Sequence, residues 1–407
     1  MRLDLTWISI FVLLLLITSC ESDFENEQDI KNSSSRLSQV QSSVPKQNQK
    51  VANQLIIKFK TTTSEFNKAN VRKTYNVDSF SRCSCNQNSI ELWEFNPDSV
   101  GKGGIEEIKT KVDTDPDLES TDFVFDLILG SSESVSTYSN IVSKVKTTNT
   151  GVTVAVIDSG IDPEIPGIMG RYLYNSSLSG NCNLTSPSGW DFVENDNLPQ
   201  DQQGHGSVVT AIIAEELDAK NIDFQILPIK AFDSNGRGNL FNIACALQYA
   251  VNNNDVDVIN MSFGWNYDNS EIIRNLLNSA GASKMLVSSA GNSSSNNDFY
   301  PHYPSGYNIP NLLSIAAHGT LPAGLAMYSN YGFNTVDFVA PGSFNPVNIE
   351  SAVNGTSYSA AFVSAKCAEL MFANSYTTDS IISQLILEST YQPDLIGWIK
   401  YPYSINP

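Results

Sequence analysis

Three stretches of this 407-residue chain contain a run of apolar residues that leads to a polar residue. They read GVTVAVID, ending at Asp158, DVDVINMS, ending at Ser262, and KMLVSSAGN, ending at Asn292. Such runs are typical of strands buried on both faces, as in a parallel sheet covered by helices. The carboxyl ends of parallel strands lie at one edge, where open α/β sheets place their sites. The pattern therefore predicts an α/β fold with helices on both faces of a parallel sheet.

Two other polar residues stand at the start of apolar helical runs. His205 lies between two glycines in QQGHGSVVTAIIAEEL, and Ser357 follows a Gly-Thr turn in NGTSYSAAFVSA. A serine in this position is an ordinary N-cap, and a lone histidine at a helix start is more often structural than functional. The glycines beside His205 favour a functional role, because they let backbone and substrate approach the ring closely. Taken singly, each residue has a structural explanation.

Taken together and in this order, these segments resemble the motif blocks of the subtilisin-like serine peptidases, or subtilases. The matching residues are Asp158 in VAVIDSGID, His205 in GHGS, Asn292 in SSAGN and Ser357 in NGTSYSAA. The resemblance covers residues 137–390 and includes YPHYPSGY and VDFVAPG. It implies a subtilisin-like parallel sheet with helices on both faces, in agreement with the fold predicted from the apolar strands.

The resemblance also implies a role for each motif residue. Ser357 is expected to be the nucleophile as well as the N-cap of its helix, with His205 as general base and Asp158 orienting the imidazole. The Asn292 side-chain amide and the Ser357 backbone N–H are expected to stabilise the oxyanion. The chain is thus expected to be a serine endopeptidase that hydrolyses peptide bonds of proteins through an acyl-enzyme. This chemistry requires no cofactor.

The same resemblance locates the substrate. An extended peptide is expected to pair with the strand formed by Ser262, Phe263 and Gly264. The S1 pocket, which takes the side chain of the residue before the scissile bond, is expected between that strand and Ala290, Gly291 and Asn292. Phe299 is expected near the base of this pocket.

Three positions depart from the usual family pattern. Ser207 and Val208 stand where a threonine and a second histidine are usual, and Ala361 stands where a proline is usual. None of them removes a reacting atom, so activity is expected to survive. Two alternatives stay open, a narrow-specificity peptidase that processes one exported peptide and a catalytically silent lipoprotein that binds through the same fold. The intact set of motif residues weighs against the silent protein.

Calcium binding is common among subtilases, and one acidic loop offers suitable ligands. The segment WDFVENDNLPQDQQ contains the oxygen donors Asp191, Asn195, Asp196 and Asp201. Oxygen donors of this kind suit a structural Ca²⁺. An acidic solvated loop is the alternative.

The N-terminal segment predicts export and a lipid anchor. Residues 1–19 have the apolar run of a signal peptide, and ITSC resembles a bacterial lipobox that would leave Cys20 to be lipidated. Ordinary signal cleavage with an incidental cysteine is the alternative. Residues 20–50 are polar and predict a tether. The protein is therefore expected to be exported and anchored to a bacterial membrane in the cell envelope, with outward display as the expected orientation.

Residues 51–128 predict a separate α+β unit of ferredoxin-like type, in which three strands alternate with two helices. By resemblance this unit is a propeptide that assists folding and inhibits the enzyme. Residues 129–150 are expected to be a cleavable linker, and residues 151–407 the peptidase domain. If cleavage occurs there, the lipid is expected to leave with the propeptide and release the catalytic domain, unless the propeptide stays bound.

Charge and cysteine content limit the partners. The net charge of −19 argues against nucleic acid, because phosphate binding needs clustered Lys and Arg. With only three histidines, a His-rich metal site is not expected. Cys83 and Cys85 are too close for an unstrained bond, and Cys245 and Cys367 lie on apolar helical patterns that predict buried small hydrophobes. Peptides, the chain's own propeptide and a membrane are the expected partners.

Overall fold

The computed structural model describes residues 45–84, 89–101, 103–130, 151–162, 173, 189–319, 324–346, 352–374 and 377–406. These residues belong to one compact unit. The predicted signal peptide, Cys20, most of the tether and nearly all of the predicted linker lie outside the described residues. Within the described ranges, no helix has the length and apolarity needed to cross a membrane.

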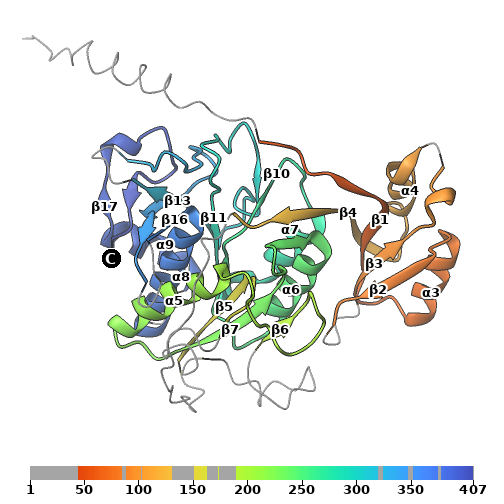
Figure 1. The fold of residues 1–407 in the computed structure, drawn as a ribbon, viewed down its shortest axis with the longest axis horizontal. Helices are drawn as coiled ribbons and strands as arrows, with labels where there is room; N and C mark the ends of the chain where they lie inside the picture. Colours follow the sequence, from red (N-terminus) through yellow and green to blue (C-terminus); the bar gives the residue numbers. More distant parts are fainter. Residues whose placement is uncertain are drawn as a thin grey trace, which may run out of the picture. The chain divides into compact units, whose positions relative to one another are not determined.

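The larger domain is built on a central sheet, which in the described part of the chain has nine strands (Figure 1). Their order is β17-β18-β14-β13-β11-β9-β5-β7-β6, with parallel pairing from β18 to β6 and one antiparallel pair, β17 with β18. The strands are β5 (Val152–Asp158), β6 (Trp190–Asp191), β7 (Phe224–Lys230), β9 (Val258–Met261), β11 (Met285–Ser289), β13 (Leu312–His318), β14 (Phe338–Pro341), β17 (Thr390–Tyr391) and β18 (Tyr403–Ser404).

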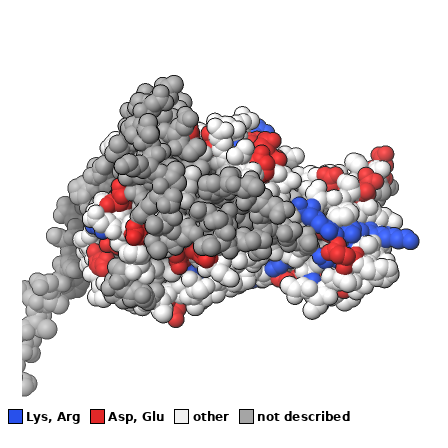
Figure 2. Space-filling model, turned by 90° about the horizontal axis from the view of Figure 1, so that it is seen from below, with Lys and Arg blue, Asp and Glu red and all other residues white. Residues whose placement is uncertain are grey.

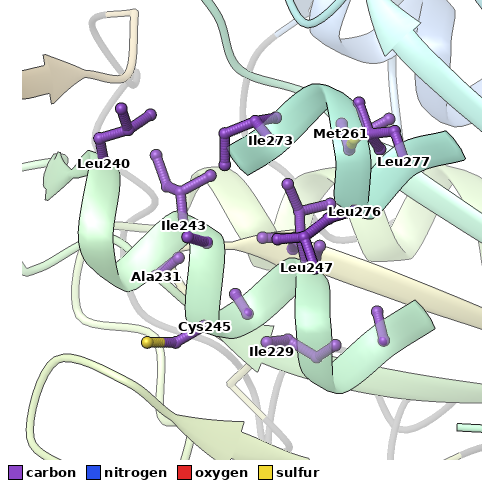
Figure 3. Packing of buried hydrophobic residues seen from close by; sticks show 14 of the residues in the cluster. Ile229, Ala231, Leu240, Ile243, Cys245, Leu247, Met261, Ile273, Leu276 and Leu277 are labelled. Atoms are coloured by element: carbon purple, nitrogen blue, oxygen red, sulfur yellow. The ribbon is translucent and has the colours of Figure 1, made fainter. Parts of the chain in front are cut away.

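Helices cover both faces of this sheet, as the apolar strands predicted. Alternate residues of β5 belong to different cores, because successive strand side chains point to opposite faces. Ala155 and Ile157 pack with α6 (Leu240–Asn252) and α7 (Glu271–Ser279). Figure 3 shows side chains of these two helices in this core, among them Leu247 and Leu276. Val154 and Val156 pack with α5 (His205–Ala219), α8 (Thr356–Asn374) and α9 (Thr378–Glu388). The α/β class is confirmed.

Residues 50–128 form the expected α+β unit. Its elements are β1 (Lys50–Phe59), α3 (Glu65–Thr74), β2 (Ser79–Arg82), β3 (Ile90–Glu94), α4 (Gly104–Val112) and β4 (Leu118–Ile128). The antiparallel order β2-β3-β1-β4 is ferredoxin-like. The sequence pattern missed β2, because its residues are almost all exposed and lack an apolar alternation.

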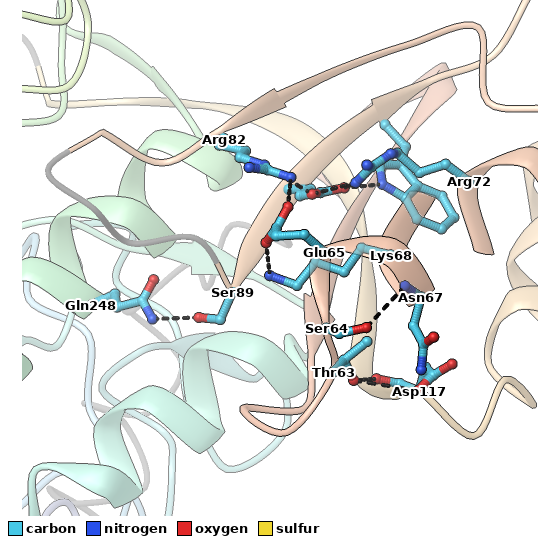
Figure 4. A network of polar contacts seen from close by, with 12 residues as sticks. Thr63, Ser64, Glu65, Asn67, Lys68, Arg72, Arg82, Ser89, Asp117 and Gln248 are labelled. Atoms are coloured by element: carbon cyan, nitrogen blue, oxygen red, sulfur yellow. Dashed lines mark hydrogen bonds and ion pairs between the residues drawn. The ribbon is translucent and has the colours of Figure 1, made fainter. Parts of the chain in front are cut away.

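Charged side chains bind the elements of this unit together. Glu91 on β3 is fully buried and accepts hydrogen bonds from Arg72, Arg82 and the Trp93 indole. Glu65 pairs with Lys68 and Arg82 (Figure 4). On the face drawn in Figure 2, the Lys and Arg atoms accordingly gather mainly over the α+β unit, next to Asp and Glu. Paired in this way, the buried carboxylate is not left as an isolated charge.

The α+β unit is joined to the larger domain by a strand pair. β4 pairs antiparallel with β8 (Arg237–Asn239), which precedes α6, and so extends the small sheet to five strands. The pairing continues past β4, since the Leu129 amide donates to the Gly236 carbonyl over 2.8 Å. Leu127 and Leu129 are buried in the same core as Phe232 and α6.

A disulfide and a helix cap join the same two regions. Cys83 is bonded to Cys245 on α6, which corrects the prediction that Cys245 is only a buried hydrophobe. Cys367 is a buried free thiol, as predicted. Asp122 on β4 caps α7. It accepts hydrogen bonds from Ser270 Oγ, Ile272 N and Glu271 N over 2.6, 2.8 and 3.2 Å. A carboxylate at this position satisfies amides that the helix itself leaves unpaired.

Candidate active site

Asp158 and His205 are held together at the carboxyl edge of the sheet. Asp158 is the last residue of β5 and fully buried, and His205 is the first residue of α5. His205 Nδ1 lies 2.8 Å from Asp158 Oδ1, which also accepts the Ser159 amide over 2.8 Å. A buried carboxylate at this distance keeps the proton on Nδ1 and leaves Nε2 as the basic nitrogen.

The pKa of His205 reflects two opposing effects. Burial lowers it, because the charged imidazolium loses solvation, but the charge and hydrogen bond of Asp158 outweigh this effect. The net result is a pKa above the ordinary value of 6.5. The imidazolium that forms when His205 accepts a proton is therefore stabilised by its neighbour.

The glycines around His205 are required by the backbone. Gly204 adopts a left-handed φ of 100°, which glycine accommodates without steric cost. A Cβ on Gly206 would lie 2.3 Å from the Gly160 carbonyl oxygen. The His205 amide donates to Gln203 Oε1 over 2.9 Å. These contacts fix where the imidazole emerges from the helix.

Ser357 lies in the first turn of α8, one residue after the helix begins at Thr356. Its Oγ donates to the Ser262 carbonyl over 3.1 Å, and Ser262 Oγ donates to the Ser357 carbonyl over 2.8 Å. The prediction that Ser357 is the N-cap is thus wrong, because the helix already begins at Thr356. The hydroxyl is directed toward the neighbouring strand end instead. The Tyr358 ring packs against the His205 ring, with centroids 5.5 Å apart.

Asn292 is oriented by the residue before Ser357. Its Oδ1 accepts hydrogen bonds from both the backbone N–H and the hydroxyl of Thr356, each over 2.9 Å. Since the oxygen faces Thr356, the Nδ2 donor is directed elsewhere, and it lies beside Gly355. The first amides of α8, including that of Ser357, have no partner within the helix. The Asn292 Nδ2 and the first amides of α8 are therefore hydrogen-bond donors at the start of the helix that carries Ser357.

The predicted substrate-binding residues follow two neighbouring strands. β9 pairs with β11 in parallel, so Ser262, Phe263 and Gly264 leave the sheet beside Ala290 and Gly291. Gly291 has a φ of 105°, and its amide donates to the Thr356 hydroxyl over 3.2 Å. The structure thus brings both stretches next to Ser357.

Phe299 does not lie in this pocket, contrary to the sequence prediction. Its side chain is 77% exposed. The residue that lies between the two stretches is His302, whose ring contacts Gly264 and Gly291. His302 belongs to the motif YPHYPSGY. Its place in this motif was the feature of the sequence that could have identified it as a pocket residue.

The residues at the three unusual positions are accommodated in the fold, two of them by packing and one by hydrogen bonds. Val208 and Ala361 are core residues between the sheet and its helices. Ser207 Oγ donates to Asp201 and accepts the Asp162 amide. The substitutions therefore leave the hydrogen bond between Asp158 and His205 in place.

The calcium site predicted in the acidic loop is not assembled. Asp191 pairs with the buried Lys230 over 3.2 Å and accepts two backbone amides. Both oxygens of Asp201 and one oxygen of Asp196 also accept hydrogen bonds from neighbouring residues. Asn195 contacts Ser84 of the α+β unit. Within the described residues, no three His, Cys, Asp or Glu side chains converge on one point.

Comparison with known proteins agrees with this geometry. The subtilase family model matches residues 149–398, more than half of the chain. A thermophilic serine proteinase from Bacillus sp. (strain AK1) is 33% identical over 55% of this chain and 51% of that protein. Thermitase from Thermoactinomyces vulgaris is 26% identical over 51% of this chain and 70% of that protein. The chain thus spans about half the length of the first relative.

Among solved structures, a cold adapted subtilisin-like serine proteinase is 20% identical and covers 64% of this chain and 96% of that one, with a TM-score of 0.48. The assignment does not depend on this likeness. It rests on the family match, which includes Asp158, His205, Asn292 and Ser357. The chain belongs to the subtilase family.

Proposed function

We propose that the protein is a serine endopeptidase that cleaves proteins or peptides. The observation that carries this proposal is the 2.8 Å contact between Asp158 and His205, at the same sheet edge as Ser357 and Asn292. A serine hydroxyl is a weak nucleophile and needs a base whose tautomer is fixed by a third group. This pair supplies both requirements.

The proposed reaction has two halves. As Ser357 Oγ bonds to the scissile carbonyl carbon, its proton passes to His205 Nε2 and the carbonyl oxygen becomes an oxyanion. When the C–N bond breaks, the imidazolium gives that proton to the leaving amine. Water then attacks the acyl-enzyme, with His205 again as base, and releases the acid and Ser357.

The oxyanion is stabilised by two donors in this proposal, Asn292 Nδ2 and the Ser357 amide. Thr356 holds the Asn292 amide with its nitrogen available, so the donor needs no reorganisation during the reaction. The amide of Ser357 adds the partial positive charge of a helix N-terminus. Before reaction, Ser357 Oγ must exchange its bond to the Ser262 carbonyl for one to His205.

The α+β unit acts, in this proposal, as a propeptide and inhibitor. Its last residues support this role, because Leu129 pairs with Gly236 beside the loop that leads into His205. A Cβ on Gly236 would lie 3.4 Å from Leu129 Cβ and 3.3 Å from Gln203, whose side chain holds the His205 amide. A peptide substrate that approached the same edge would have to displace this strand.

Export and lipid anchoring through Cys20 complete the proposal. Both rest on the sequence of residues 1–20. Replacement of Cys20 by alanine should move the protein from the membrane fraction to the soluble fraction. Retention in the membrane fraction would contradict the anchor.

The peptidase proposal is tested with residues 21–407 and a matched Ser357→Ala variant. A serine-directed fluorophosphonate should label the first protein only, and casein should be cut by the first only. Intact mass after reduction should show self-cleavage close to residue 130 in the first protein and none in the variant. A folded protein that neither labels nor cuts would overturn the peptidase and favour the silent binding lipoprotein.

A further inference from the structure

The position of the S1 pocket follows from the two oxyanion donors and the strands beside them. A carbonyl oxygen held by Asn292 and the Ser357 amide puts the residue before the scissile bond next to the ends of β9 and β11. The side chain of that residue must then extend between Gly264 and Gly291, which continue those two strands. The room between these glycines therefore decides which side chains are accepted.

That room is occupied by the imidazole of His302. A Cβ on Gly264 would lie 2.2 Å from His302 Cε1 and 2.3 Å from Nε2, so the ring rests directly on the glycine backbone. On the other side, a Cβ on Gly291 would lie 3.0 Å from the same Nε2. One ring thus contacts both walls of the pocket.

The ring is held firmly in this place. His302 Nδ1 is hydrogen bonded to Ser305 Oγ over 2.8 Å, and the side chain is almost completely buried. Its backbone belongs to β12 (His302–Tyr303), which pairs with β10 (Trp265–Asn266), directly after Gly264. Burial lowers the pKa of His302 to about 4, so the ring is neutral at the pH values at which His205 acts as a base. A neutral ring has no charge that would draw it out into water.

We propose that His302 closes the S1 pocket, so that this peptidase cleaves after glycine and, less efficiently, alanine, and discriminates against large residues. The inference rests on the proposed peptidase function and deepens it. It makes the enzyme a narrow-specificity peptidase in place of one that cleaves after large apolar residues. A pocket already filled by a side chain rejects added volume because no cavity is available to receive it.

If the α+β unit is the propeptide, its last residues agree with this specificity. Leu127 and Leu129 are buried, Ile128 is 68% exposed, and the Leu129 amide is bonded to Gly236 beside the His205 loop. The alternation is that of an extended peptide bound along the edge. For cleavage, the next residue along the chain is the one that would have to enter the S1 pocket. That residue is Gly130, which has no side chain.

Self-cleavage of residues 21–407 tests the inference in the chain itself. We expect the cut directly after Gly130, a slower cut in Gly130→Ala, and a cut at least tenfold slower than the original in Gly130→Phe. In the uncut chain a Cβ on Gly130 would meet nothing within 4 Å, so Gly130→Ala introduces no clash there. His302→Gly should restore the cut in the Gly130→Phe background. A Gly130→Phe chain that cuts itself at the original rate and position would overturn the inference.

A peptide series gives a second readout. In otherwise identical substrates with Gly, Ala, Leu or Phe before the scissile bond, the enzyme should prefer Gly over Phe by at least 100-fold in kcat/KM. His302→Gly should raise kcat/KM for Phe at least tenfold, whereas the exposed Phe299→Ala should leave the profile unchanged. His302→Ala serves if the glycine variant does not fold.

The outcomes separate the two proposals. An enzyme that labels with the fluorophosphonate but prefers Leu or Phe would overturn the role of His302 and leave the peptidase proposal intact. Absence of labelling and cleavage with every peptide would overturn the peptidase proposal, and the S1 inference with it.

Discussion

The central sheet of the subtilase domain and the sheet of the α+β unit differ in where their covering helices come from. The central sheet is covered on both faces by helices of its own domain. The small sheet is covered on one face by α3 and α4, where Leu55 and Ile57 pack. Its other face, with Ile56, Ile90 and Phe125, belongs to the core of α6 and α7 in the subtilase domain.

This difference assigns separate tasks to the two regions. The subtilase domain completes its own core and can place polar groups at one sheet edge for chemistry. The α+β unit completes its core only against the other domain, so its folding and its docking are one process. Substitutions at the sheet edge should therefore lower the catalytic rate and leave the α+β unit docked on the subtilase domain. Substitutions in β4 should weaken this docking and leave the catalytic groups in place.

Asp158→Asn should have the largest effect on rate. The amide can hold His205 in the wrong tautomer, and losses of about 10⁴-fold in kcat are known for this change in other serine peptidases. Steady-state kinetics on a Gly peptide measures the loss. Hydrogen exchange of the β4 amides should stay unchanged, and loss of their protection would break the separation between the two regions.

Asn292→Ala should lower kcat by about 10²- to 10³-fold with little change in KM, a magnitude taken from subtilisin, a member of the same family. The donor acts on the oxyanion, which exists only after attack, so substrate binding is spared. Asn330→Ala is a matched control, because Asn330 supports the same loop through the Ser293 and Ser295 amides without reaching the carbonyl. An equal loss of kcat in the control would assign the effect to loop structure.

Asp122→Ala should act on docking. Removal of a helix cap costs about 1 kcal/mol, which is roughly a fivefold change in an equilibrium. Peptidase activity of the intact chain should therefore rise by about this factor, as β4 leaves the cleft more often. Hydrogen exchange of Ile272 and Gly238 should quicken in parallel. Lower activity with unchanged exchange would show that β4 does not obstruct the substrate.

Catalysis in the subtilase domain and docking of the α+β unit should both depend on pH. The raised pKa of His205 places the acid limb of kcat/KM above pH 6.5, because the base is protonated below it. Burial raises the pKa of Asp122 from 3.8 to about 6 in the docked state. The part of the docking stability that comes from its protonation is therefore complete below pH 3.8 and is lost as pH rises through about 6, whereas the helix cap remains. Acid should thus weaken catalysis and tighten docking together.

Measurement of kcat/KM from pH 5 to 9 checks the first part, and exchange protection of β8, corrected for intrinsic rates, checks the second. His302→Gln should leave the acid limb in place, since His302 is already neutral in this range. An acid limb near pH 5 would contradict the raised pKa of His205.

The sequence was sufficient to predict the position of a site residue wherever an apolar strand ended at that residue. The position of Asp158 follows from that pattern, because parallel strands share one carboxyl edge. The sequence was insufficient where a residue makes its contacts with residues from distant segments of the chain. Lys230 and backbone amides occupy the predicted calcium ligand Asp191, and the bond from Cys83 joins residues separated by 162 positions.

The S1 pocket shows the same limit on a smaller scale. The motif around His302 was visible in the sequence, but residue spacing could not tell whether Phe299 or His302 turns inward. That choice depends on the pairing of β12 with β10, which aligns His302 with Asn266 just after Gly264. The N-cap of α8 was misplaced by two residues, since the helix begins at Thr356 and its cap position is Gly355. Only the bond to the Ser262 carbonyl shows where the Ser357 hydroxyl points.

The bond between Cys83 and Cys245 closes the chain into a covalent ring that contains every residue between them. Cutting a ring once opens it without producing two molecules. Any single cleavage after Gly130 or elsewhere within the ring therefore leaves the two parts as one particle, heavier by one water. On a gel run without reductant, the protein should give one band before and after processing. With reductant, the processed protein should give two bands. On an anchor at Cys20, the processed enzyme would stay at the membrane until a thiol opened that bond.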